Sequence, residues 1–406
     1  MVLALCIAVM TAALLFGGAT RSGYLSDLIV QLSAVPLLVF ALYRHATMPA
    51  DRRRYQPFVV VGLLLLIPVL QLVPLPAGVW TMLPNRAAVA QGLALAGISP
   101  SFMPLSLAPR DTWLAALSLI PPLGMYLGAL LLTLRERRSL SLVVLAIGMA
   151  GVLVGLLQIA QGESSPLRFF DITNRREAVG FFANRNHFAA FTYVLTLLAW
   201  AWILSLAAHP IARRSRKGDD SVRTLYLFAG VLTLAVLFAC QVPARSRAGM
   251  GLMLLALMGL FLLTRNTGSK ARGSPSLGGL LIAMGLGLIL VVQFAMVRLL
   301  ERFLDHSDAF PETRAGVWRS TIEAAVSYMP FGAGLGSFLS VYPAFEKTSD
   351  IVIDTYMNRA HNDYLEFWLE AGVIAPVVLV AFVVWLVGRL ARLWQQPAGI
   401  MQPADL

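Results

Sequence analysis

Charge is scarce in this sequence. Only 13% of its 406 residues are Asp, Glu, Lys or Arg, whereas an ordinary soluble domain carries about 25%. Hydrophobic residues make up 58% of the chain, and the mean hydropathy is +0.74. Because one soluble core cannot hide so much apolar sequence, the composition excludes an ordinary soluble enzyme and predicts a chain that folds in a lipid bilayer.

Cysteines and metal-binding motifs are also scarce. Cys6 and Cys240 are the two cysteines, and each lies in an apolar run. The topology predicted below places them near opposite membrane faces, so we expect unpaired packing residues. The sequence has no H-E-x-x-H motif and no clustered Cys/His set, so we expect neither a metal site nor another cofactor. It also lacks the internal repeat that is typical of inverted-repeat transporters.

Acidic residues are outnumbered by basic ones, and the net charge is +11. In a soluble protein this excess would suggest a nucleic-acid partner. Here most of the basic residues lie between apolar runs, where arginine and lysine commonly flank membrane helices. The charge therefore indicates membrane lipids, not nucleic acid, as the partner.

Long apolar runs are what the chain has in abundance. A membrane-spanning helix needs roughly 17–25 mostly apolar residues, and ten segments meet this requirement. They are 2–19, 25–43, 57–74, 113–134, 139–160, 187–208, 223–242, 247–264, 276–297 and 371–392. The sequence therefore predicts an all-α, polytopic membrane protein with about 10 transmembrane helices.

Basic residues alternate between the loops that connect these segments. The basic loops are 44–54, 135–138, 213–223, 265–272 and 389–392. The positive-inside rule places them, and both termini, in the cytoplasm. The apolar N-terminus has no basic residues before its first run, so we expect a first membrane helix and not a cleaved signal peptide. The longer loops 75–112, 161–186 and 298–370 then lie outside, and we expect the functional site there.

The loop 298–370 contains two predicted helices. The first begins near Asp308 and Pro311, ends at Pro330, and carries Arg314 one turn before Trp318. Its expected apolar stripe is Trp318, Ile322, Ala325 and Met329. The run 331–338 that follows contains three glycines and is expected to be a flexible turn. It lacks the G-x-G-x-x-G spacing, so nucleotide binding is not expected.

The second predicted helix begins near Asn358 and includes Arg359 and His361. Helical spacing places His361 on the packed face, with Asn362, Asp363, Glu366 and Glu370 on another. Two interpretations of His361 remain open at this point. It is either a core histidine bonded to a neighbour or a general base, because imidazole titrates near neutral pH.

Two further polar segments lie at the predicted outer face. Asn184, Arg185 and Asn186 precede the sixth span, and Arg245 and Arg247 lie at the start of the eighth. These residues either bind a substrate or anchor the helix ends, with arginines reaching lipid phosphates. Arginine matches phosphate oxygens and stays charged, so the set suits a lipid-linked pyrophosphate. Cations for a departing pyrophosphate and a base for an acceptor hydroxyl need no metal in principle.

These segments together resemble those of the O-antigen ligase/polymerase superfamily. The resemblance rests on Arg314, the Pro330–Phe338 turn, Ala360-His361-Asn362-Asp363-Tyr364-Leu365, Gly180 to Ala189, and Ser246-Arg247-Ala248-Gly249. It covers about 160–385. It implies a membrane domain of helices 1–5 at 1–160, a catalytic region at 161–392 that includes the periplasmic loop 298–370, and a cytoplasmic tail at 393–406.

The resemblance implies a GT-C-like glycosyltransferase in the bacterial inner membrane with a periplasmic active site. Members take glycan from undecaprenyl pyrophosphate and pass it to the lipid A core, to another glycan or to a protein hydroxyl, so polymerase and protein O-oligosaccharyltransferase remain alternatives. A lipid-glycan transporter is the alternative of another class.

The resemblance also implies roles for single residues. By motif, His361 is the catalytic base, Arg247 and Arg314 act on the pyrophosphate, and Arg185 steadies it. Substrate-binding residues are Arg185, Asn184, Asn186, Arg245, Asn362 and Arg359. Family ligases commonly have about twelve spans, against ten here.

Overall fold

The computed structural model describes residues 1–19, 25–48, 52–171, 173–208, 217–266, 310–348, 351 and 357–395. It is mostly helical, with 74% helix, which confirms the all-helical class. The described residues fall into two compact units, each built from separate stretches of chain. The first unit combines Met1–Arg44 with Gly124–Asp305, and the second combines His45–Leu123 with His306–Gln395.

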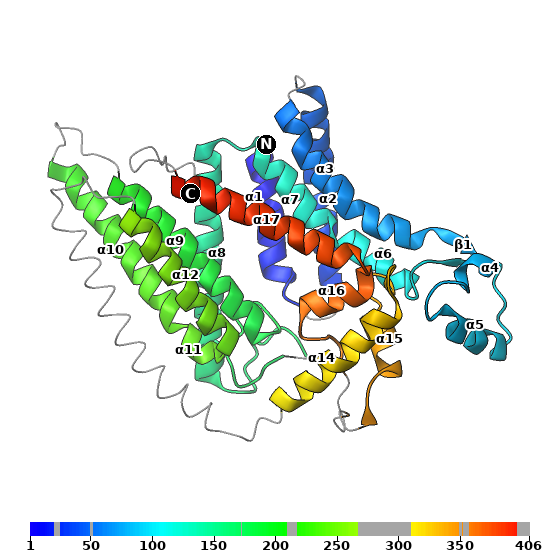
Figure 1. Cartoon of the computed structure of the whole chain (residues 1–406). Helices are drawn as coiled ribbons and strands as arrows, with labels where there is room; N and C mark the ends of the chain where they lie inside the picture. The colour runs from blue at the N-terminus through cyan, green and yellow to red at the C-terminus, as the bar shows by residue number, and fades with distance from the viewer. Residues whose placement is uncertain are drawn as a thin grey trace. The chain divides into compact units, whose positions relative to one another are not determined.

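The first unit is a bundle of helices. Its elements are α1 (Val2–Phe16), α2 (Leu25–Thr47, which ends in the second unit), α7 (Ile120–Leu131, which begins there), α8 (Leu134–Gln161), α9 (Arg185–Ala208), α10 (Lys217–Ala239), α11 (Gln241–Ala244) and α12 (Arg247–Asn266). Helix α9 packs against α10 and α12, and α8 packs against α1 and α9 (Figure 1). A capping box of Thr133 and Glu136 begins α8 five residues before the predicted span.

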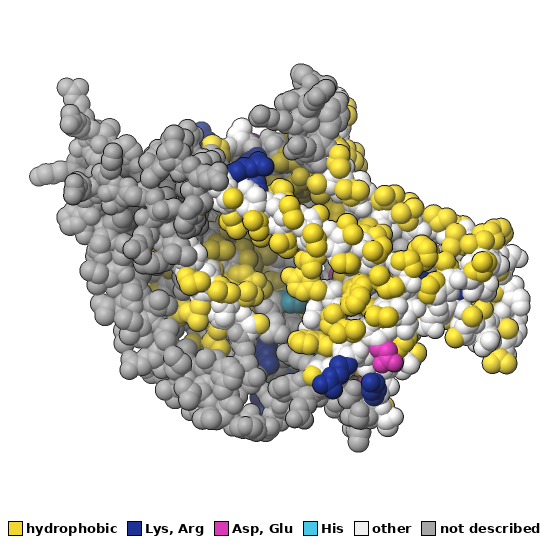
Figure 2. Space-filling view, in the orientation of Figure 1, with side chains coloured by type: hydrophobic (Ala, Val, Ile, Leu, Met, Phe, Trp, Pro, Cys, Tyr) yellow, Lys and Arg dark blue, Asp and Glu magenta, His cyan; other side chains and the backbone are white. Residues whose placement is uncertain are grey.

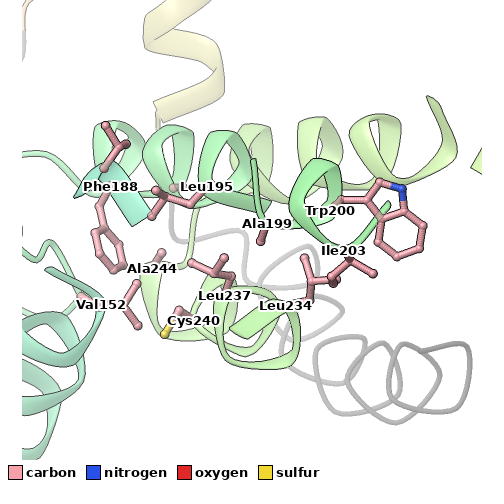
Figure 3. Close-up of a cluster of buried hydrophobic side chains, with 13 residues drawn as sticks. Val152, Phe188, Leu195, Ala199, Trp200, Ile203, Leu234, Leu237, Cys240 and Ala244 are labelled. Carbon is pink, nitrogen blue, oxygen red and sulfur yellow. The ribbon is translucent and has the colours of Figure 1, made fainter. Parts of the chain in front are cut away.

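The core of this unit lies between α9 and α10. Figure 3 shows Leu195 and Ile203 of α9 turned toward Leu234 and Leu237 of α10, with Cys240 at the end of the same face. The α9 residues lie eight apart, close to two helical turns, so they share one face. Helix α8 approaches closely because its buried face carries glycine. A Cβ at Gly148 would lie 2.4 Å from the Leu195 side chain, so a larger residue there would require Leu195 to move.

The second unit holds a small two-stranded sheet and the predicted outer helices. Its elements are α3 (Arg52–Leu72), β1 (Pro74–Pro76), α4 (Ala77–Trp80), α5 (Arg86–Leu95), β2 (Phe102–Pro104), α6 (Pro109–Ser118), α14 (Phe310–Ser327), α15 (Phe338–Val341), η1 (Tyr342–Ala344), α16 (Asp363–Ala371) and α17 (Ile374–Gln395). Strands β1 and β2 pair antiparallel, with Leu75 opposite Met103. Helix α16 packs against both α14 and α17.

Helix α14 confirms the first predicted helix of the loop 298–370, although its buried face differs from the expected stripe. The structure buries Val317, Ala324 and Tyr328 in one core with residues of α15 and α16. Ala325 of the expected stripe is buried there too, whereas Trp318 is 39% exposed. The face is set by partners distant in sequence, because Phe338 and Tyr342 stack at 5.0 Å within the same core. Local spacing alone therefore centred the predicted stripe about one residue away from the face that the structure buries.

Among the residues that the structure describes, six helices are long and apolar enough to cross a membrane. They are Leu25–Thr47, Pro109–Leu131, Leu134–Gln161, Arg185–Ile203, Leu225–Ala244 and Ile374–Arg392. Shorter apolar helices, Val2–Phe16 and Phe58–Leu72, fall on the first and third predicted spans. Helix α12 falls on the eighth, and the ninth, 276–297, lies outside the described residues. In Figure 2 hydrophobic side chains cover much of the surface where α17 runs in Figure 1.

Both cysteines are buried and unpaired, as predicted.

Candidate functional site

In the first unit the structure brings together two of the segments singled out in the sequence. The Ser246 hydroxyl donates a 2.8 Å hydrogen bond to Oδ1 of Asn186, which lies 60 residues earlier. Ser246 also accepts from the backbone N–H of Gly249 at 3.0 Å and so caps the start of α12. Asn184 Oδ1 accepts from the Asn186 N–H at 2.8 Å. The N-termini of α9 and α12 therefore form one polar cluster.

Arg185 has an ion-pair partner in this cluster. Its Nη1 lies 2.5 Å from Oε1 of Glu177, and the two side chains are 24% and 12% exposed. Asn174 Oδ1 accepts from the Arg185 backbone N–H at 2.9 Å. Glu177 and Asn174 both come from the loop that precedes α9. The guanidinium charge is thus offset by the carboxylate of Glu177.

The loop before α9 is held by buried side chains of the helices. Gln158 of α8 is fully buried, donates to the carbonyl of Gly180 at 2.9 Å, and accepts from the N–H groups of Val179 and Gly180. Gln241 of α11 donates to the Ala189 carbonyl at 3.0 Å and to the Thr192 hydroxyl. These interhelical amide contacts fix the backbone on which Asn184 and Arg185 lie.

Two predicted arginines follow α11. Arg245 ends this helix in a left-handed conformation, with φ of 50°, and is exposed. Arg247 is the first residue of α12, which agrees with its predicted place at the start of the eighth span. The side chain of Arg247 lies outside the described residues, as does that of Arg314 in the second turn of α14.

In the second unit His361 is not part of a helix, and the expectation of a packed face was wrong. Helix α16 begins at Asp363, and Asn362 is its N-cap, with Oδ1 accepting from the N–H groups of Tyr364 and Leu365. His361 precedes the cap with φ of 51° and is exposed. An N-cap residue leaves the helical conformation, so the residue before it need not follow the periodicity of the helix.

Glu366 holds the segment that precedes His361. Its Oε1 lies 2.6 Å from Nη1 of Arg359, and its Oε2 accepts from the Ala360 N–H at 2.9 Å. The indole N–H of Trp318 donates to the Ala360 carbonyl at 3.1 Å. One carboxylate and one tryptophan thus fix both backbone groups of the residue before His361.

Glu370 holds the glycine-rich turn at the other end of α16. Its Oε1 accepts from the Phe338 N–H at 3.3 Å, and its own carbonyl accepts from Gly334 N–H and Gln71 Nε2. Burial raises the pKa of Glu370 to about 7, and the nearby Glu366 adds to this effect. Both glutamates are 7% exposed, so the expectation that they lie on a face other than the packed one was wrong.

The glycine-rich turn is ordered, contrary to the expectation of a flexible segment. Gly332, Gly334 and Gly336 all have positive φ, which suits glycine. A Cβ at Gly332 would lie 2.5 Å from the Glu370 carbonyl oxygen, and one at Gly334 would lie 2.1 Å from Ser106 Oγ. The turn therefore packs between α16 and the residues that lead into α6.

Four residues of these clusters were not predicted from the sequence: Glu366, Glu370, Glu177 and Gln71. The i, i+4 spacing of Glu366 and Glu370 was a usable signal, because two carboxylates on one helical face of an apolar chain are costly to bury without partners. No local signal pointed to Gln71 or Glu177, whose partners come from other segments.

A comparison with known protein families matches part of the chain. The family model described as O-antigen ligase matches residues 228–380. The match begins within α10 and ends within α17. The match includes Ser246, the glycine-rich turn and His361, and it excludes Asn184, Arg185 and Asn186. Neither the curated proteins nor the solved structures gave a match. Over this matched segment, which is less than half of the chain, this integral membrane protein is similar to the O-antigen ligase family.

Proposed function

We propose that this chain moves glycan from undecaprenyl pyrophosphate to an acceptor hydroxyl, with the lipid A core as the favoured acceptor. The family match over residues 228–380 is the observation that carries the proposal. The helices described above support an enzyme that works within a membrane. We place it in a bacterial inner membrane, with both termini cytoplasmic and the reacting groups on the periplasmic face.

His361 is the proposed base. Support comes from its setting, since it is exposed and immediately precedes the N-cap of α16. Left-handed backbone costs a residue other than glycine about 1–2 kcal/mol, and the bonds to Ala360 and Asn362 on either side sustain it here. A base held in one geometry by its neighbours needs little reorganisation when the acceptor arrives.

The proposed reaction is a single displacement. The His361 imidazole takes the proton of the acceptor hydroxyl, the oxygen attacks the anomeric carbon, and the bond from this carbon to the pyrophosphate oxygen breaks. Undecaprenyl pyrophosphate leaves as an anion. We assign Arg247 and Arg314 to the stabilisation of this charge, because arginine donates in pairs to phosphate oxygens and stays protonated. No metal ion is required in this scheme.

The remaining polar residues are proposed to bind the substrate. Asn184, Asn186 and Arg245 lie with Arg247 at the ends of α9, α11 and α12. Arg359 has a half-exposed side chain in its pair with Glu366 and can extend to a glycan hydroxyl. The Oδ1 of Asn362 is the helix cap, so we assign its amide nitrogen to the substrate. Arg185 steadies the pyrophosphate in concert with Glu177.

A gel of surface glycolipids from a deletion strain beside its parent tests the proposal. Loss of all long chains, with lipid-linked polymer accumulating, is expected of a ligase. A core that keeps one repeat would instead establish a polymerase, and an unchanged ladder would point to an exopolysaccharide or protein acceptor. Purified protein that carries lipid-linked glycan across vesicles without forming a glycosidic bond would establish a transporter and contradict the enzyme.

A further inference from the structure

The segment 74–107, called here the 74–107 lobe, connects α3 to α6 and contains β1, α4, α5 and β2. Arg86 is its one charged residue, and it is 1% exposed. The Arg86 guanidinium donates to the carbonyls of Leu105 and Gly332 at 2.7 and 3.0 Å and lies over the rings of Trp80 and Tyr328. The surface of this lobe, which the structure describes in full, therefore carries no charged side chain.

Large apolar side chains take the place of charge on this surface. Leu95 is 91% exposed and Met82 is 84% exposed, and Val79, Ile98 and Phe102 are exposed as well. A surface in water typically has about 25–35% charged residues. Exposed apolar side chains grouped without charge mark a surface that another apolar phase covers.

Part of the backbone of the lobe is suited to lipid because several of its polar groups bond within the lobe. Strands β1 and β2 pair with each other, and the Ala77 N–H donates to the Ser101 carbonyl at 2.9 Å. The Trp80 indole N–H donates to the Pro104 carbonyl at 2.8 Å. After α5, the Ile98 N–H donates back to Leu93 at 2.9 Å. Lipid supplies no such partners, so a segment that contacts it must satisfy its own.

The lobe continues the apolar surface of α3. This helix has an apolar stretch from Phe58 to Leu72 and runs directly into β1, and its exposed side chains include Val69, Leu70 and Val73. Figure 2 shows hydrophobic side chains extending over the end of α3 toward β1 as located in Figure 1. Nothing polar separates the two surfaces along the chain between Leu72 and Pro76.

We infer that the 74–107 lobe inserts into the membrane at the C-terminal end of α3, with Met82 and Leu95 in contact with bulk lipid. It is then not the water-exposed loop that the sequence predicted for 75–112. The buried Arg86 ties the lobe to the glycine-rich turn through Gly332, so membrane insertion also fixes the depth of this turn. The inference rests on the lobe's own surface and is independent of the proposed reaction.

Single-cysteine labelling of the full chain tests this inference. Leu95→Cys and Met82→Cys are labelled with an environment-sensitive NBD fluorophore and reconstituted in phosphatidylcholine–phosphatidylglycerol vesicles without polyprenyl lipid. Lys347→Cys, in the same unit and with a side chain 58% exposed, is the matched control. The unsubstituted chain gives the background, because Cys6 and Cys240 are buried.

Blue-shifted emission at Leu95 and Met82, quenched several-fold more strongly by lipids brominated in the acyl chain than emission at Lys347, is the expected result. Emission and quenching equal to those of Lys347 at both positions would place the lobe in water and overturn the inference. Blue-shifted emission that brominated lipids fail to quench would also overturn it, because protein and not lipid would then cover the lobe.

Discussion

At the scale of single residues, a buried carboxylate sets the position of the proposed base. Glu366 bonds Arg359 with one oxygen and the Ala360 N–H with the other, and His361 follows directly in a left-handed conformation. Glu366 can affect turnover without contacting the substrate. It is a positioning residue, whose loss would let His361 relax toward a commoner backbone conformation.

Replacement of His361 and replacement of Glu366 should lower turnover to different extents. We expect His361→Ala to lower turnover by about 10²–10⁴-fold, the usual contribution of general base catalysis. Glu366→Gln should lower turnover by on the order of 10²-fold at most, with little change in KM, because it displaces the base without removing it. Rates measured with lipid-linked donor and purified acceptor test both values.

The matched control is Glu323→Gln on α14. Glu323 is an exposed carboxylate 3.9 Å from Lys347, so this change should leave turnover and stability nearly unchanged. Normal transfer by His361→Ala, with normal membrane insertion, would remove His361 from the role of base. A Glu366→Gln variant that lost only stability, at unchanged turnover, would show that Glu366 acts on folding alone.

Glu370 should make stability depend on pH. Its pKa is raised from the ordinary value of 4.5 to about 7 by burial, so the folded state keeps a proton that the unfolded state releases at lower pH. This favourable contribution is complete below about pH 4.5 and is lost as the pH rises toward 7. The native chain should therefore lose on the order of 2–3 kcal/mol between about pH 5 and pH 8.

The Glu370→Gln variant isolates this contribution. Glutamine keeps an oxygen for the Phe338 N–H but does not ionise, so its unfolding free energy should change less over the same pH range. Urea titrations in detergent at the two pH values provide the measurement. Equal slopes of stability against pH in the two proteins would contradict the assignment to Glu370.

At the scale of elements, close approach of α9 and α12 depends on Gly249. A Cβ there would lie 2.5 Å from the Ala189 Cβ and 3.1 Å from Ser246 Oγ. Both helices would have to separate, and the Ser246–Asn186 hydrogen bond between them would lengthen. Packing of this kind is possible only where small residues face each other.

Gly249→Ala should therefore destabilise the chain by about 1–3 kcal/mol, as overpacked cores do. Gly251→Ala, two residues along α12, is the control, because a Cβ at Gly251 meets nothing within 4 Å. It should be neutral or slightly stabilising, since alanine favours helix. Thermal unfolding in detergent compares the two, and equal midpoints would mean that α9 and α12 adjust freely.

At the scale of the whole molecule, orientation in the membrane decides which face holds the reacting groups. Helix α8 has 28 residues and is about 42 Å long at 1.5 Å per residue, enough to cross the bilayer. Its ends differ in charge, because Arg135, Arg137 and Arg138 lie in its first turns. The positive-inside rule predicts that this end faces the cytoplasm.

Accessibility of cysteines at the two ends of α8 tests the orientation. A membrane-impermeant maleimide added to intact cells should label Ser164→Cys, which is exposed beyond the C-terminal end of α8. Arg137→Cys, exposed at the other end, should react only after the inner membrane is permeabilised. The reverse pattern would place the candidate site in the cytoplasm and exclude a periplasmic transfer reaction.

The sequence by itself determined the membrane class, the family resemblance and most apolar helices, including the first helix of the loop 298–370. Apolar run length, charge alternation and helix-breaking proline are local properties of the chain, and they survive folding. Tertiary structure alone decided the exposure of His361, the burial of Glu366 and Glu370, and the order of the glycine-rich turn. Each of these depends on hydrogen-bond partners such as Gln71 and Trp318 that lie far along the chain, and local periodicity carries no information about them.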